Sequence, residues 1–345
     1  MIRLGVVGYG YWGPNIVRNF ADVSECQLAA VSDMRPERLA MVRSRYPAVK
    51  TYADPNELIA DRRVDAVVIV TPVSTHYDLA MQALRAGKHV LVEKPLASTS
   101  EQAARLVEEA ERRQLVLSVD HTFVYTGAVR KMRELVTSDA LGEIYYYDSV
   151  RVNLGLFQHD VNVIWDLAVH DLAIMDHVLA SKPIAVSATG MSHLGNEPEN
   201  IAYLTLFFEN RLIAHLHVNW LAPVKVRRTL VGGSRKMIVY DDLEPSEKIK
   251  VYDKGVTVNG NGSGNGNKYR MLIDYRSGDM CAPQLDITEA LRTEAKHFIK
   301  CIEVSQPTMT DGHAGLRVVR ILEAATASIA ARGRIVELDA VGVTA

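Results

Sequence analysis

The stretch "GVVGYGYWG", residues 5 to 13, follows the first apolar run of the chain and places glycine at positions 8, 10 and 13. This is G-x-G-x-x-G spacing, and Pro14 directly after it suits the first turn of a helix. In such a loop the first glycine permits a tight turn, the second lets the backbone approach a pyrophosphate, and the third allows close packing of helix on strand. Alone, the motif also fits an ordinary glycine turn, so its context decides the fold.

The chain up to about residue 120 alternates short apolar runs with amphipathic ones. The strand-like runs are "IRLGVV", "CQLAAVS", "VDAVVIV", "HVLVEK" and "LVLSVD", and the helical segments are 13 to 22, 36 to 45, 74 to 86 and 99 to 113. Nearly continuous Val, Ile and Leu strands separated by helices are typical of a parallel sheet covered on both faces. The sequence therefore predicts an α/β protein in which residues 1–121 form a doubly wound, dinucleotide-binding Rossmann domain.

An acid follows the second predicted strand at the expected distance. Asp33 lies twenty residues after Gly13, where a carboxylate accepts hydrogen bonds from the adenosine ribose hydroxyls. Its charge should repel a 2′-phosphate, which predicts NAD as the cofactor, although Arg35 can moderate that choice; a helix-capping role for Asp33 is the alternative. The residues expected to contact NAD in this region are Gly8, Gly10, Tyr11, Trp12, Gly13, Asp33, Met34 and Arg35.

The second half, residues 122–345, has a different pattern. Strand-like runs follow one another from 143 to 241 with hairpin signals between them, which predicts an antiparallel or mixed sheet with few helices. Gly and Asn dominate residues 255 to 268, where we expect a mobile loop. Helical spacing returns at 286 to 304 and 311 to 331, and one or both of these helices are expected to pack on the first domain.

Composition excludes several classes of protein and site. Lys and Arg number 39 against 41 Asp and Glu, and no basic run marks a nucleic-acid or membrane surface. Cys26, Cys281 and Cys301 lie far apart without a C-x-x-C motif, so we expect neither a disulfide framework nor a cysteine zinc site. The chain enters a strand at once and has no apolar run of membrane-spanning length, which favours the cytoplasm.

A lysine emerges at the end of a predicted strand. "AGKHVLVEKPLAS" runs from a strand into Glu93, Lys94 and Pro95. In open α/β sheets ligands bind outside the carboxyl ends of the strands, so Lys94 is expected near a bound nicotinamide. The alternative is a surface lysine after a strand.

A second cluster of ionisable residues occurs in "NVIWDLAVHDLAIMDH", residues 162 to 177. Asp166 and His170 are four residues apart and share one face of a helix. Asp171 points elsewhere, and Asp176 and His177 fall near the end of the helix. A metal site needs a third ligand from outside the stretch, so no metal is expected. By itself, the Asp166 and His170 pair also fits a structural hydrogen bond.

Together, "GYGYWG", "TPVSTHYDLAMQALRAGKHVLVEKP" and "WDLAVHD" resemble the Gfo/Idh/MocA family of NAD(P)-dependent sugar and inositol oxidoreductases. The resemblance implies a C-terminal α/β domain with an open-faced, mainly antiparallel sheet that makes a homodimer or homotetramer. It also implies a catalytic lysine at Lys94 and a catalytic pair at Asp166 and His170. Thr71, Pro72, His76 and Glu93 match segments that line the cofactor, with an exposed first-turn position as the alternative for His76.

Within the family, residues 153 to 171 and 232 to 255 are most similar to UDP-N-acetylglucosamine and UDP-N-acetylglucosaminuronate 3-dehydrogenases. Val169 departs from that pattern, where a proline or small residue is expected, and so weakens the transfer of substrate identity. Myo-inositol or free-sugar dehydrogenases, 3-ketosugar reductases and catalytically silent NAD-binding regulators are the alternatives. The polar candidates for contact with the sugar or nucleotide sugar are Arg151, Asn153, Gln158, Asn162 and Trp165, and ordinary polar residues of a strand edge and loop are the alternative.

These residues suggest a mechanism for oxidising a secondary alcohol. Such a step removes a proton from the hydroxyl as hydride leaves the carbon, and histidine, with an unperturbed pKa of about 6.5, can accept that proton. His170 would be the base, Lys94 would stabilise the developing alkoxide and Asp166 would orient His170 or hold a neighbouring hydroxyl. Lys94 as the main acid or base is the alternative.

Overall fold

The computed structural model of the protein describes residues 1–155, 161–195, 198–259 and 272–338. The chain divides into two compact units. The first comprises Met1–Val129, Leu172–His177 and Ile287–Ala324, and the second comprises the remaining segments. The sequence placed a single boundary after residue 121, whereas the first unit continues to Val129 and takes in two later segments.

The first unit contains a six-stranded parallel sheet with the order β3-β2-β1-β4-β5-β6. The strands are β1 (Ile2–Val7), β2 (Cys26–Ser32), β3 (Lys50–Tyr52), β4 (Ala66–Ile69), β5 (His89–Glu93) and β6 (Leu117–Asp120). The connecting helices are α1 (Gly13–Ala21), α2 (Pro36–Arg45), α3 (Pro55–Ala60), α4 (His76–Arg85) and α5 (Ser100–Arg112). This is the predicted doubly wound sheet, and its strand order reverses between β1 and β4, where such sheets bind ligands.

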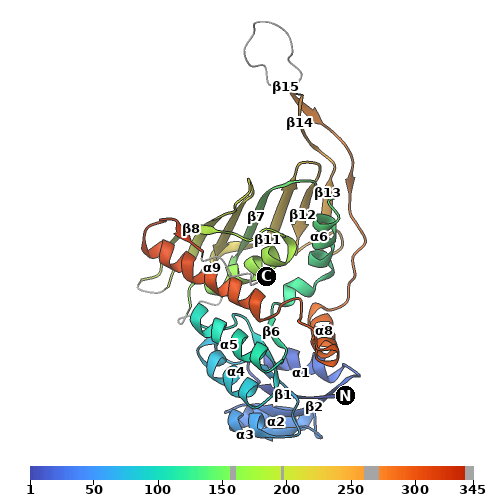
Figure 1. Cartoon of the computed structure of the whole chain (residues 1–345), viewed down its shortest axis with the longest axis vertical. Coiled ribbons are helices and arrows are strands. Elements are labelled where there is room, and N and C mark those ends of the chain that lie inside the picture. The colour runs from blue at the N-terminus through green and yellow to red at the C-terminus, as the bar shows by residue number, and fades with distance from the viewer. Residues whose placement is uncertain (156–160, 196–197, 260–271, 339–345) are drawn as a thin grey trace. The chain divides into compact units, whose positions relative to one another are not determined.

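Residues from both ends of the chain share the core of this unit. On one face, α1 and α8 (Ala290–Val304) lie side by side (Figure 1), and Phe20 meets Phe298 edge to face with ring centroids 6.3 Å apart. On β1, a Cβ at Gly5 would lie 2.6 Å from Leu58 of α3, so glycine lets α3 pack closely on the strand. Because α8 fills part of this core, no single cut in the sequence separates the units.

The second unit contains a nine-stranded sheet in which β7 and β10 pair in parallel and all other pairs are antiparallel. Its order is β16-β13-β12-β11-β7-β10-β9-β8-β17. The strands are β7 (Ile144–Leu154), β8 (Ala185–Met191), β9 (Ile201–Phe207), β10 (Ile213–Asn219), β11 (Leu221–Gly233), β12 (Met237–Asp241), β13 (Ile249–Tyr252), β16 (Met280–Cys281) and β17 (Val336–Glu337). The predicted mainly antiparallel sheet is therefore confirmed.

The two faces of this sheet differ in exposure. Along β10, Ala214, Leu216 and Val218 are fully buried, whereas Ile213 on the other face is 46% exposed. Strict alternation of this kind marks a sheet with one covered and one open face. Further helices are α6 (Gly127–Thr137), the π-helix η3 (Ile164–Ala168), α7 (Val169–Val178) and α9 (Gly312–Ala330).

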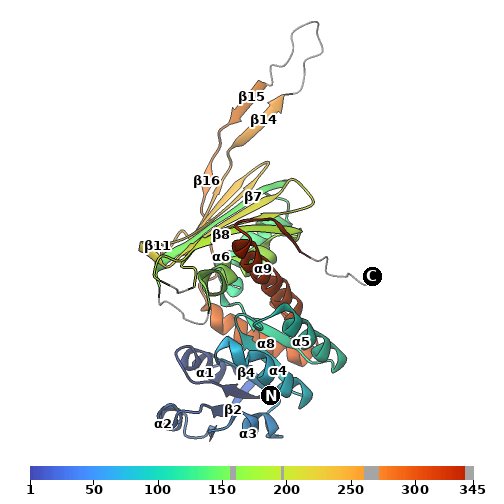
Figure 2. The ribbon, with the colours of Figure 1, turned by 90° about the vertical axis from the view of Figure 1, so that its left-hand side faces the viewer.

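Paired strands occupy part of the segment where the sequence predicted a loop. β14 (Gly255–Asn259) pairs with β15 (Leu272–Arg276) in antiparallel register, and the two strands extend away from the nine-stranded sheet (Figures 1 and 2). The first five residues of the expected loop are thus a strand. Residues 260 to 268 of that prediction lie outside the described residues.

Candidate functional site

The glycine loop connects β1 to α1 at the switch point of the parallel sheet. Gly8 has a φ of +100°, and a Cβ there would lie 2.3 Å from the Val70 carbonyl oxygen, so the turn requires glycine. A Cβ at Gly13 would lie 2.5 Å from the Gly8 carbonyl oxygen. These two glycines are needed to form the loop itself.

Gly10 differs from both, because a Cβ there would meet only Arg35 Nη2, at 3.5 Å. The loop itself leaves room at this position for a small side chain. A glycine that the local fold does not require is the position at which the backbone can approach a pyrophosphate. The first residues of α1 have no side-chain cap, and such a helix start binds anions. The loop therefore fits the phosphates of a dinucleotide.

Asp33 follows β2 beside this loop and is 8% exposed. Its Oδ2 accepts from the backbone N–H of Tyr9 (2.8 Å), and its Oδ1 accepts from the backbone N–H of Arg35 (2.9 Å). The Arg35 guanidinium also donates to both oxygens, at 3.0 and 3.1 Å. Burial raises the pKa of Asp33, but the bonds from Arg35 and Tyr9 outweigh burial and lower it. The carboxylate is therefore ionised at neutral pH, as an acceptor for ribose hydroxyls must be.

The turns after β4 and β5 are tied together by His76. Its ring nitrogens lie 2.8 Å from the carbonyl oxygens of Thr71 and Pro95, and the side chain is 1% exposed. The alternative of an exposed first-turn histidine is therefore wrong. Thr71 Oγ1 also bonds Thr75 Oγ1 at 2.7 Å. Lys94 lies in the turn that His76 holds, directly before Pro95, with a cis peptide bond between them.

Three carboxyl groups gather at the ends of β5, β6 and α8. Trp12 Nε1 of the glycine loop donates to Asp120 Oδ2 (3.0 Å), and Thr122 Oγ1 donates to Asp120 Oδ1 (2.5 Å). Burial, followed by the charge of Asp120, raises the pKa of both Glu93 and Glu294 well above the ordinary value. Burial and a neighbouring carboxylate therefore both disfavour the charged form of Glu93 and Glu294 in the unit that contains Lys94.

Asp166 lies in η3 of the second unit. Asn162 Oδ1 accepts from the backbone N–H groups of Ile164 (3.1 Å) and Trp165 (3.3 Å), so its side chain caps the start of this helix. Trp220 Nε1 donates to Asp166 Oδ2 at 3.0 Å. The sequence predicted one regular helix here, whereas residues 164–168 are π-helical and the α-helix begins at Val169. His170 is in the first turn of that α-helix.

Several residues predicted to contact substrate have structural partners. Arg151 is 3% exposed, and its Nε and Nη2 donate to Asp171 at 2.7 and 3.2 Å. Trp165 Nε1 donates to Thr326 Oγ1 at 3.0 Å. Asn153 is half-buried near the end of β7, and Gln158 lies outside the described residues.

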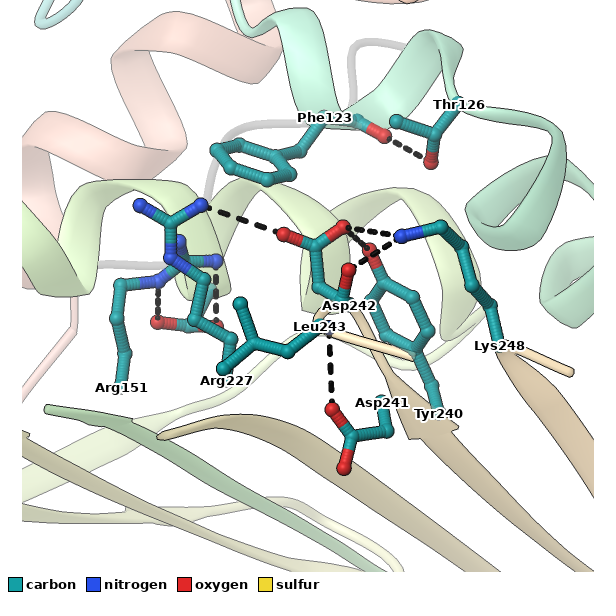
Figure 3. Close-up of polar contacts among 10 residues, drawn as sticks. Phe123, Thr126, Arg151, Arg227, Tyr240, Asp241, Asp242, Leu243 and Lys248 are labelled. Carbon is teal, nitrogen blue, oxygen red and sulfur yellow. Dashed lines mark hydrogen bonds and ion pairs between the residues drawn. The ribbon is translucent and has the colours of Figure 1, made fainter. Parts of the chain in front are cut away.

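A polar network beside Arg151 was not predicted. Asp242 accepts from Arg227 Nη1 (3.3 Å) and from the Tyr240 hydroxyl (3.1 Å), and Lys248 Nζ lies 3.5 Å from it (Figure 3). Burial raises the pKa of Asp242, but Lys248 and Arg227 outweigh burial and lower it. The network is therefore ionic, and it stabilises the end of β12.

Two family models match the chain. "Oxidoreductase family, NAD-binding Rossmann fold" matches residues 2–121, and "GFO/IDH/MocA C-terminal domain" matches residues 129–239. The chain belongs to the GFO/IDH/MocA family of oxidoreductases. The resemblance stated from the sequence is thereby confirmed.

Members of the family with assigned activities align along most of the chain. UDP-N-acetylglucosamine 3-dehydrogenase of Acidithiobacillus ferrooxidans is 30% identical over 92% of this chain and 94% of its own. Myo-inositol 2-dehydrogenase of Thermotoga maritima is 24% identical over 95% of this chain and 96% of its own.

Solved structures of GFO/IDH/MocA proteins share the fold. The Acidithiobacillus ferrooxidans UDP-N-acetylglucosamine 3-dehydrogenase superposes with a TM-score of 0.80 at 26% identity, covering 96% of this chain and 98% of that one. An aldose-aldose oxidoreductase of Caulobacter crescentus superposes with a TM-score of 0.81 at 20% identity, covering 98% and 99%, which shows the fold alone. Among the described residues of this family member, no helix is both long and apolar enough to cross a membrane.

The sequence missed residues whose importance depends on distant partners. Asp120 ends β6 as Lys94 follows β5, so the strand-end argument applied to Lys94 would have found it. Glu294 gave no signal, because its burial follows from the packing of α8. The tie made by His76 was likewise invisible, since it depends on two backbone carbonyl groups.

Proposed function

We propose that this protein is an NAD-dependent dehydrogenase that oxidises a secondary hydroxyl of a sugar, the 3-hydroxyl of a UDP-N-acetyl sugar being the leading candidate. The observation that carries the proposal is the combination of a pyrophosphate-compatible glycine loop, an ionised Asp33 and Lys94 after β5, all at the carboxyl edge of one parallel sheet. The substrate class is supported by the two aligned relatives, which act on a nucleotide sugar and on an inositol.

Asp33 supports NAD rather than NADP as the cofactor. Its ionised carboxylate presents negative charge where the 2′-phosphate of NADP would bind, and Arg35 is held by both of its oxygens. The negative charges of the Asp33 carboxylate and a 2′-phosphate would repel each other, whereas ribose hydroxyls can donate hydrogen bonds to the carboxylate. The residues proposed to bind the cofactor are those expected from the sequence. His76 would support the cofactor site indirectly, because it holds the turns after β4 and β5 together.

In the proposed reaction the substrate O–H and C–H bonds break and a C=O bond forms. NAD, when bound, accepts the hydride. His170 accepts the hydroxyl proton, Lys94 donates a hydrogen bond to the same oxygen, and Asp166, whose Oδ2 is held by Trp220, orients the reacting groups.

A substrate panel tests this function. Purified protein is mixed with NAD or NADP and with UDP-N-acetylglucosamine, its uronate, myo-inositol or free hexoses, and the absorbance of reduced nicotinamide is followed. We expect reduction of NAD with a UDP-N-acetyl sugar. Turnover of myo-inositol alone would instead support the inositol alternative. Binding of NAD without turnover of any compound, including 3-ketosugars tested with reduced NAD, would support a silent regulator.

We also propose that the open face of the nine-stranded sheet joins two or four copies of the chain. Tyr203 and Ile213 on this face are 44% and 46% exposed, and Tyr203 stacks on His217 with ring centroids 4.4 Å apart. Exposed apolar side chains on adjacent strands are typical of interaction surfaces.

A further inference from the structure

His76 connects the carboxyl ends of two neighbouring strands through both nitrogens of its ring. Nδ1 lies 2.8 Å from the carbonyl oxygen of Pro95, and Nε2 lies 2.8 Å from that of Thr71. The side chain is 1% exposed, so bulk water cannot replace either partner. Pro95 directly follows Lys94, so this contact fixes the turn from which the lysine projects.

A carbonyl oxygen can only accept a hydrogen bond, so two carbonyl partners require two ring protons. A neutral imidazole has one N–H group and one lone pair. In this geometry its lone pair would face a carbonyl oxygen at hydrogen-bond distance, which is repulsive and leaves a buried acceptor unsatisfied. The bonding pattern of His76 is therefore that of an imidazolium ion.

Two other histidines of the same unit show the opposite pattern. His89 Nδ1 accepts from the backbone N–H of Val116 (3.0 Å), and His297 Nε2 accepts from the backbone N–H of Met309 (3.1 Å). In each case one ring nitrogen uses its lone pair and carries no proton. These two histidines are neutral by the same criterion that makes His76 a cation.

Opposing effects act on the charge of His76. Burial has the largest effect and lowers its pKa, the bonds to Pro95 and Thr71 raise it, and the charge of Lys94 lowers it, so that on balance the pKa of His76 is lowered. The two carbonyl partners argue for the charged form against that balance. Hydrogen bonds from a charged donor are about twice as strong as neutral ones. Both carbonyl bonds exist only in the charged form, and in the neutral form one of them becomes a repulsion.

We propose that His76 is doubly protonated in the folded protein and is a positioning residue that holds Lys94 at the end of β5. The inference rests on the proposed function of Lys94 at the substrate hydroxyl. It assigns to His76 no contact with substrate. Its effect passes through the Pro95 carbonyl to the backbone of the turn, while the Thr71 carbonyl anchors that turn to the end of β4.

The ring protons are tested in wild-type protein labelled with [¹⁵N]histidine. Two-bond ¹H–¹⁵N correlation spectra are recorded at neutral pH with NAD present, and His76, His89 and His297 are assigned from the signals that single His→Gln variants lose. We expect both His76 nitrogens to resonate as protonated, and His89 and His297 each to show one protonated and one unprotonated nitrogen. A single protonated nitrogen in His76 would overturn the proposal. This result does not depend on any substrate, so it is separate from the failure of the proposed function.

The positioning role is tested by comparing His76→Gln with the matched variant His89→Gln. His89 is the first residue of β5, the strand that Lys94 follows, and lies at the opposite end of that strand from Lys94. Glutamine offers one amide group and cannot donate to both carbonyls in the ring geometry. We expect His76→Gln to lower kcat about tenfold or more, with KM and NAD affinity within about threefold of wild type. The control should keep wild-type kcat. An unchanged kcat in His76→Gln, or equal losses in both variants, would overturn the role. If His76→Gln does not fold, His76→Asn replaces it, and the wild-type spectrum still decides the charge state.

Discussion

Single residues of the first unit owe their chemistry to partners that the fold supplies. Asp33 is ionised because backbone and guanidinium N–H groups converge on its two oxygens. His121 shows the opposite environment, since it is 2% exposed and, among the described residues, neither ring nitrogen has a hydrogen-bond partner. Asp33 is thus held charged and His121 neutral. The first affects the cofactor preference, and the second affects how stability depends on pH.

Replacing Asp33 tests the cofactor preference. Asp33→Ser removes the charge that repels a 2′-phosphate and releases the Arg35 guanidinium. We expect NAD affinity to fall about tenfold, through loss of a charged acceptor, and NADP affinity to rise. Titration calorimetry with both dinucleotides measures the change. Asp22→Ser, at the exposed end of α1, is the control, and an unaltered preference in Asp33→Ser would refute the role of Asp33.

The buried His121 predicts how stability depends on pH. Burial lowers its pKa to about 4, from an ordinary value of 6.5. Its contribution is complete above pH 6.5 and is lost as the pH falls toward 4, because the unfolded chain binds a proton that the folded protein does not. The interval of 6.5 − 4 = 2.5 corresponds to roughly 3 kcal/mol.

Urea unfolding of wild type and His121→Asn between pH 7 and pH 4 measures this effect, since other acidic groups contribute equally to both proteins. We expect the free energy of unfolding to fall less steeply in the variant as the medium is acidified. Parallel pH profiles would show that His121 gains its proton as readily when folded as when unfolded.

At the level of secondary structure, five of the six strands of the first unit could be predicted from the sequence because they lie in runs of mostly apolar residues that are mostly buried. The strand β3 was not predicted, because it has only three residues and Lys50 in it is exposed. Pattern could not reveal η3. Residues 162 to 177 have the spacing of a regular helix, but the first turn is wound more widely and is capped by Asn162. Caps, and the indole bond from Trp220 to Asp166, depend on segments distant in the sequence, so only the structure shows them.

Removing the cap of η3 should weaken the second unit. Asn162→Ala leaves two helical N–H groups without their side-chain acceptor, and we expect the free energy of unfolding to fall by about 1 kcal/mol. Chemical denaturation measures it. Asn162→Ser keeps an acceptor oxygen and should recover most of the loss; equal destabilisation by both substitutions would point to the bond with Glu199 instead.

At the level of the whole molecule, the fold class, the family and the packing of a late helix on the first domain could be predicted from the sequence, but the exact segments of each unit could not. The amphipathic spacing of residues 286 to 304 predicted a helix, and packing of Phe298 on Phe20 makes α8 part of the first core. Arg151 illustrates the converse case. Its polar neighbourhood favoured substrate contact, whereas it is buried in an ion pair with Asp171, a partner that is also in the candidate stretch.

Assembly through the open face of the second sheet is a prediction at this level. The double variant Tyr203→Lys and Ile213→Lys places two positive charges on that face, and we expect a smaller particle in light scattering than the wild-type oligomer. Ile287→Lys changes an apolar residue that is 97% exposed in the first unit, so it should leave the size unchanged. A double variant of wild-type size would place the interface elsewhere.

The central claim, that Lys94 serves hydride transfer to NAD, is tested by measuring turnover and NAD affinity together in Lys94→Ala. The control is Lys296→Ala, an exposed lysine on α8 of the same unit. With the substrate found in the panel, we expect kcat of Lys94→Ala to fall about 100-fold or more while NAD affinity stays within about threefold. Wild-type turnover in Lys94→Ala would contradict the account.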